Sequence, residues 1–103
     1  MIADPATVVL TALVAYWADD HPARTMWLIE CLQRHNTGDW GELGAADCAA
    51  NDHAIRHGSR QVMSRYPVPD ELSDPADTDD AIWIITDDPD FEPITTILWP
   101  SDY

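Results

Sequence analysis

The chain has 103 residues, a hydrophobic fraction of 46%, and 19 acidic against 5 basic residues, which gives a formal net charge of −14. The hydrophobic fraction excludes a disordered chain, and the length predicts a single domain over residues 1–103 with one core. The charge excludes nucleic acid and anionic membranes as partners, because both would be repelled, and it favours a basic protein surface. We expect the protein to be a monomer.

The first third of the chain predicts helices. Asp4-Pro5 has the residue types of a helix start. Residues 7–17 are apolar almost throughout, and periodicity does not decide there between a buried helix and a buried strand; we favour a helix. Pro22–His35 predicts a clearer helix, because its apolar residues form one stripe. The stripe consists of Trp27, Leu28, Cys31, Leu32 and His35.

A turn and a second polar helix follow. Gly38-Asp39-Trp40-Gly41 predicts a chain reversal in which at least one glycine has a positive φ and the indole of Trp40 is buried. Ala45–His57 predicts a helix whose weakly apolar side carries Cys48, Asn51 and Ile55.

Three strands complete the predicted fold. Arg60–Tyr66 alternates in the manner of a half-buried strand, Ala81–Thr86 reads as a strand buried on both faces, and Thr95–Trp99 is the third. Helices followed by strands are typical of the α+β class. We therefore predict two or three N-terminal helices packed on a three-stranded antiparallel meander.

Carboxylates crowd both sides of the strand Ala81–Thr86, and no Lys or Arg interrupts them. A rigid strand with acids at each end would hold negative charge in a fixed arrangement, so these acids are the predicted partner-binding residues. They are Asp70, Glu71, Asp74, Asp77, Asp79, Asp80, Asp87, Asp88, Asp90 and Glu92.

Metal and catalytic sites are less well supported by the sequence. Cys31 with His35 and His53 with His57 have i,i+4 spacing, but no Cys-x-x-Cys supports a zinc site, and the acidic loops lack the glycine and glutamate of an EF-hand. No catalytic motif of a hydrolase, metalloprotease or P-loop enzyme is present. We expect no metal, no cofactor and no enzymatic activity.

The remaining tryptophans and cysteines complete the prediction. Trp40 and Trp83 are expected in the core, whereas Trp99 is weighed as a partner-facing anchor against a place in the core. Two cysteines without a paired framework favour a reduced, cytoplasmic protein, and the N-terminus lacks the features of a signal peptide.

A pattern runs through the last two-thirds of the chain. It reads R-H-x-x-G-D-W-G-x-L at Arg34–Leu43 and D-x-x-x-N-D-x-A-I at Asp47–Ile55. It continues with G-x-R at 58–60, S-x-Y at 64–66, W-I-I-T at 83–86 and T-T-I-L-x-P-x-x-Y at 95–103. With this pattern the chain resembles a family of small plasmid- and phage-borne proteins.

The chain departs from that family's pattern after W-I-I-T and between the first two strands, where it carries longer and more acidic segments. In composition it also resembles anti-restriction and anti-CRISPR proteins that mimic DNA. This resemblance implies an inhibitor that acts in the host cytoplasm and presents its acids to the basic DNA path of a type I CRISPR effector complex or a type I restriction enzyme. The alternative is a plasmid or phage accessory or antitoxin-like protein whose acids form a solvated surface.

Overall fold

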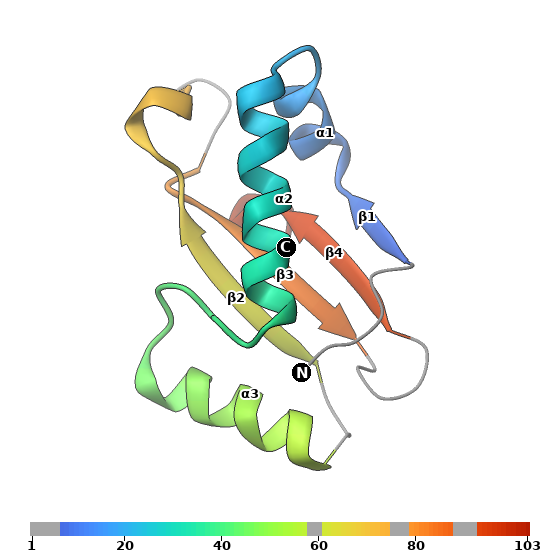
Figure 1. Cartoon of the computed structure of the whole chain (residues 1–103), viewed down its shortest axis with the longest axis vertical. Helices are drawn as coiled ribbons and strands as arrows, with labels where there is room; N and C mark the ends of the chain where they lie inside the picture. The colour runs from blue at the N-terminus through green and yellow to red at the C-terminus, as the bar shows by residue number, and fades with distance from the viewer. Residues whose placement is uncertain (1–6, 58–60, 75–78, 88–92) are drawn as a thin grey trace.

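The structure is a computed structural model of the chain, and it describes residues 7–57, 61–74, 79–87 and 93–103. Its fold is of the α+β class, with one sheet of strand order β1-β4-β3-β2 (Figure 1). The strands of the described part are β1 (Val8–Leu10), β2 (Val62–Pro67), β3 (Ala81–Asp87) and β4 (Ile94–Leu98). Its helices are α1 (Ala12–Ala18), α2 (Pro22–Asn36) and α3 (Ala45–His57), with the 3₁₀ turns η1 (Asp70–Leu72) and η2 (Pro100–Asp102).

The antiparallel meander is confirmed. β3 pairs with β2 on one side and with β4 on the other, so the strand between the acids is an interior strand. The predicted number of strands is wrong, because β1 adds a fourth strand that runs parallel to β4, with Val8 opposite Thr95. The sheet is therefore mixed.

The sequence suggested one continuous element over residues 7–17, with a helix favoured over a strand, and this is wrong. The stretch forms β1, breaks at Thr11, and continues as α1. The break is held by Thr11, whose N–H donates to the Ile97 carbonyl over 3.0 Å and whose hydroxyl donates to Asp102 Oδ2 over 2.7 Å. Both partners lie near the other end of the chain, so local periodicity carried no signal of this break. The predicted helix start at Asp4-Pro5 lies outside the described residues.

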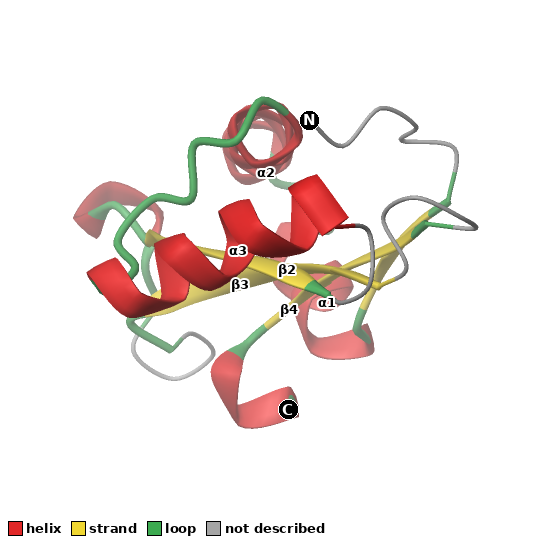
Figure 2. Cartoon of the chain, turned by 90° about the horizontal axis from the view of Figure 1, so that it is seen from below, coloured by secondary structure: helices red, strands yellow, loops and turns green. Residues whose placement is uncertain are grey.

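One face of the sheet carries the core. Alternate residues of β2 are buried, as the alternation in its sequence predicted, whereas β3 is buried at every position except Trp83 and Asp87, in keeping with the prediction of a strand buried on both faces. Figure 2 shows α2 above the sheet and the C-terminal turn below it. The main cluster joins residues of α1 and α2 to this face: Val14, Trp17, Ala18, Leu28, Cys31, Tyr66, Ile82, Ile84, Ile97 and Trp99.

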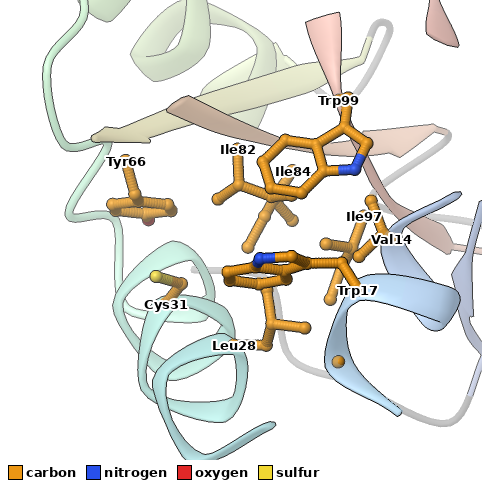
Figure 3. Packing of buried hydrophobic residues seen from close by; sticks show 10 residues of the cluster. Val14, Trp17, Leu28, Cys31, Tyr66, Ile82, Ile84, Ile97 and Trp99 are labelled. Atoms are coloured by element: carbon orange, nitrogen blue, oxygen red, sulfur yellow. The ribbon is translucent and has the colours of Figure 1, made fainter. Parts of the chain in front are cut away.

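Trp99 belongs to this core, which is one of the two environments that the sequence left open for it. Its side chain is 1% exposed and meets Trp17 edge-on, with ring centroids 5.1 Å apart (Figure 3). An edge-to-face pair of this kind adds to the burial of two large rings. Trp83 is only half-buried and lies on the opposite face, where its ring contacts that of Tyr103.

Candidate acidic interface

The acids predicted to bind a partner form two groups, which we call the acidic segments: Asp70–Asp80 and Asp87–Glu92. In the first, Asp70 and Glu71 lie on η1, and Asp79 and Asp80 immediately precede β3. In the second, Asp87 is the last residue of β3. The predicted residues Asp77, Asp88, Asp90 and Glu92 lie outside the described part of the chain.

The described acids of these segments face solvent to different extents. Asp70, Glu71, Asp80 and Asp87 are exposed, whereas Asp79 is half-buried and accepts a hydrogen bond of 2.8 Å from the backbone N–H of Ser101. The carboxylate of Asp87 lies 3.5 Å from the Gln61 side-chain amide, at the limit of a hydrogen bond.

Asp74 lies apart from the others of its segment. It is half-buried and lines a hollow at the end of α1 together with Asp19, Asp20 and Arg24. Its surroundings therefore include a guanidinium, which reduces the negative charge available to a partner there.

The arginines of the described part are engaged mainly elsewhere. Arg34 makes a bidentate ion pair with Asp39, and Arg65 lies 3.5 Å from Glu42. Arg24 stacks on the ring of Trp17 and donates to its carbonyl over 2.9 Å. The ion pairs of Arg34 and Arg65 therefore use Asp39 and Glu42, which lie outside the acidic segments.

Besides Arg24 near Asp74, a second arginine lies near the first segment. Arg65 lines a hollow with Asp79, Asp80 and Trp83. Its positive charge weakens the negative potential at that end of β3. The negative charge of Asp87, at the other end, is not offset by Arg65 in this way.

The two segments flank β3, as the sequence predicted. The seven residues of β3 span roughly 23 Å at about 3.3 Å per residue. This exceeds twice the Debye length of about 8 Å at physiological ionic strength, so the segments act almost independently on a partner in solution.

The motif Arg34–Leu43, which stood out in the sequence, closes one edge of the sheet. Gly38 and Gly41 both have positive φ, at 86° and 70°, and Trp40 is 7% exposed, as predicted. A Cβ on Gly41 would lie 2.1 Å from the Arg65 carbonyl oxygen, so a side chain is excluded there. The close approach lets the Arg65 N–H donate to the Trp40 carbonyl and the Arg65 carbonyl accept from the Glu42 N–H.

Asn51 of α3 closes the remainder of that edge. Its side-chain amide donates to the Met63 carbonyl over 2.6 Å, and its oxygen accepts from the Met63 N–H over 3.1 Å. The amide thus imitates a neighbouring strand. We call β2 with Trp40–Glu42 and Asn51 the sealed edge. There, the backbone groups of Met63 and Arg65 that point away from β3 all find hydrogen-bond partners.

A buried polar chain lies behind the sealed edge. His35 Nδ1 lies 2.5 Å from Ser64 Oγ and Nε2 lies 2.8 Å from Thr86 Oγ1, which in turn lies 2.8 Å from Thr95 Oγ1. Burial lowers the pKa of His35 to about 4, so the ring is neutral at pH 7. A neutral imidazole has one donor and one acceptor nitrogen, and both are used here.

These hydrogen-bonded side chains have a structural role, although a serine beside a histidine can form a nucleophile. Ser64 and His35 are each 0% exposed, so no substrate reaches them. The same burial raises the pKa of the Cys31 thiol to about 12, which keeps it protonated. Sequence reasoning missed this network; the threonines of W-I-I-T and T-T-I-L, facing inward on paired strands, were its only signal.

Metal ligands are not assembled in the part of the chain that the structure describes, where no three His, Cys, Asp or Glu side chains form a cluster. Cys31 and His35 are in the core, and His53 is exposed on α3. Among the described helices, none has the length and apolar character needed to cross a membrane.

Comparison of the chain with protein-family models, with curated proteins and with solved structures gives no match.

Proposed function

We propose that the protein is a non-catalytic inhibitor that binds a basic nucleic-acid-binding protein through its acidic segments, in the place that DNA would take. A type I CRISPR surveillance complex is the first target, and a type I restriction enzyme is the second. The proposal rests on one observation above all. Exposed carboxylates stand at both ends of an interior strand, and the arginines of the described ion pairs neutralise other acids.

The physical case is one of charge and rigidity. Duplex DNA carries one negative charge per about 1.7 Å of its axis, and proteins that bind it line their path with Lys and Arg. Carboxylates on a fixed strand occupy such a path with little loss of conformational entropy. Asp80 and Asp87 adjoin or end β3, whose backbone is hydrogen-bonded on both sides, so their backbones are held in place before binding.

The two segments are expected to contribute unequally. Asp79 is engaged by the Ser101 N–H, and Arg65 shares a hollow with Asp79 and Asp80. Both features weaken the negative potential of the first segment. We therefore assign the larger share of binding to the segment that begins at Asp87.

The test compares two neutralised variants with a control of similar charge change. One variant carries Asp70→Asn, Glu71→Gln and Asp80→Asn; the other carries Asp87→Asn, Asp88→Asn, Asp90→Asn and Glu92→Gln. The control carries Asp19→Asn, Glu30→Gln and Asp47→Asn, which are exposed acids of the helical part. Affinity for the purified type I surveillance complex, and for a purified type I restriction enzyme, is measured over a range of salt concentrations, together with displacement of target DNA.

We expect the second variant to lose at least about tenfold in affinity and to show a shallower salt dependence, the first variant to lose less, and the control to bind almost as the wild type does. If both variants bind and displace DNA as well as wild type with the same salt slope, the acidic segments are a solvated surface and the proposal is wrong.

A further inference from the structure

The two edges of the sheet differ in whether other parts of the chain cover them. The sealed edge is covered by Trp40–Glu42 and by Asn51. At the opposite end of the sheet stands β1, and no other strand of the described residues pairs with its outer side. Figure 1 shows β1 on the far side of the sheet from α3.

On that outer side, the backbone of β1 has groups that no other described strand pairs with. Thr7 accepts from the Thr95 N–H and Thr11 donates to the Ile97 carbonyl, so both point toward β4. Because direction alternates along an extended chain, the N–H and C=O groups of Val8 and Leu10 point the other way. An edge of this kind pairs readily with another extended chain.

Apolar side chains surround the open edge. A groove of about 200 Å³ runs between β1 and α2, lined by residues that include Val8, Leu10, Ile29 and Ile97. Leu10 and Ile29 are 40% and 47% exposed, and Val9 on the other face is 45% exposed. Of the eight large hydrophobic residues that are exposed in the described part, six lie between residues 9 and 29. Exposed apolar side chains beside an open strand edge favour a contact with another chain there.

The absence of charge around β1 indicates which kind of partner could pair with its outer side. Residues 7–18 contain no charged side chain in a chain of net charge −14. The basic partner proposed for the acidic segments would find no counter-charge at this edge, whereas an uncharged strand would meet no repulsion there. The chain itself supplies such a strand.

In place of the monomer expected from the sequence, we propose that a second copy of this chain pairs with it through β1, in antiparallel orientation about a two-fold axis at Val9. In this register Val8 lies opposite Leu10 of the other copy, and Leu10 opposite its Val8. Each of these pairs is of the kind that exchanges both N–H···O=C bonds. The two Val9 side chains then meet on one face, and the two grooves beside Ile29 adjoin on the other, giving one continuous sheet. The interface is isologous, as expected of a homodimer.

Sedimentation equilibrium tests this pairing. Wild-type protein is measured from about 5 to about 500 µM, at about 0.05 M and about 0.5 M NaCl. We expect a monomer–dimer equilibrium that strengthens with salt, because salt screens the repulsion between two acidic chains. This dependence is opposite to that expected for the basic partner of the proposed function, so the two proposals fail separately.

Two variants locate the contact. Leu10→Glu places a charge on the open edge and should weaken dimerisation at least about tenfold, whereas Ala50→Glu, an exposed position on α3, should leave it unchanged. A melting curve shows that each variant is folded, and amide exchange of Val8 and Leu10 should slow as the wild-type concentration rises. A wild-type protein that stays monomeric at the highest concentration and salt, or a dimer that Leu10→Glu leaves intact, overturns the proposal.

Discussion

The sealed edge and the acidic segments differ in what their polar groups bind. At the sealed edge, backbone groups of Met63 and Arg65 find partners within the chain, and so do the carboxylate of Asp39 and the imidazole of His35. In the acidic segments, exposed carboxylates such as Asp80 and Asp87 face water. The polar groups of the first region hold the fold together, whereas the carboxylates of the second are available to bind another molecule.

The motif around Gly38–Gly41 has the structural role that the sequence predicted for it, a chain reversal around a buried indole. Its residues are accounted for by positive φ, close approach and burial. A recognisable pattern therefore marks the structural core of this protein. The exposed carboxylates from which a function is proposed lie outside this motif, before β3 and at its end.

Removal of Trp40 should produce the largest effect on stability. Its indole is buried beside Val62 and Ala54, meets the ring of His35 edge-on, and points its N–H at Asp52 over 3.4 Å. Trp40→Ala should lower the free energy of unfolding by about 3–5 kcal/mol, as deletions of large buried aromatic side chains do. Urea unfolding followed by circular dichroism measures the change.

Tyr16→Ala is the matched control, because Tyr16 is an aromatic residue that is 71% exposed. It should change the free energy of unfolding by no more than about 0.5 kcal/mol. Equal effects of the two substitutions would mean that the sealed edge contributes little to stability and that the comparison between the two regions fails.

The buried imidazole behind the sealed edge predicts a specific pH dependence. Burial holds the pKa of His35 at about 4, below the ordinary value of 6.5 that it regains on unfolding. Between pH 6.5 and pH 4 the unfolded chain binds a proton that the native chain refuses, so stability falls as the pH falls through this window. The loss is about 3 kcal/mol when complete, and above pH 6.5 His35 contributes no slope.

A variant separates this effect from those of the other titrating groups. His35→Gln removes the proton-binding group, so its stability relative to wild type should improve steadily from pH 7 to pH 4.5. Urea midpoints of the two proteins at a series of pH values measure the difference. A gap that stays constant with pH would contradict a neutral, buried His35.

How far the sequence predicts this molecule depends on the range of the interactions concerned. α2, α3 and the three strands of the meander follow from local periodicity and turn residues, and they appear within a few residues of their predicted bounds. The division of residues 7–17 does not, because it depends on hydrogen bonds from Thr11 to Ile97 and Asp102. A parallel partner strand more than eighty residues away leaves no mark on local hydrophobic patterning.

For the candidate interface, too, the sequence predicts what depends on residue order and not what depends on contacts between distant residues. The sequence indicated which acids flank β3, since that follows from their order along the chain. It did not indicate that Asp79 is engaged by the Ser101 backbone or that Arg65 lies beside Asp79 and Asp80. Nor did it indicate that Trp99 is enclosed by Trp17, since a tryptophan near a chain end is compatible with either environment.

The smallest effect, and the one that addresses the acidic segments directly, is the response of stability to salt. A chain of net charge −14 repels itself in the compact state, and salt screens this repulsion. Raising NaCl from about 0.05 to about 0.5 M at pH 7.5 should raise Tm by about 4–8 °C, equivalent to about 1 kcal/mol for a domain of this size. A flat or falling curve would show that the acids are already compensated.

Two variants sharpen this last test. Asp70→Asn, Glu71→Gln, Asp80→Asn and Asp87→Asn together should leave Tm equal or higher and make its rise with salt smaller, because these acids are exposed and take no part in the ion pairs of Arg34 and Arg65. Asp39→Asn with Glu42→Gln removes fewer charges yet should lower Tm, because each lost ion pair lowers the free energy of unfolding by up to about 1 kcal/mol. If neutralising the acidic segments destabilised the protein as much as breaking the ion pairs of Arg34 and Arg65, those acids would be serving the fold, and they would no longer be the surface to offer a partner.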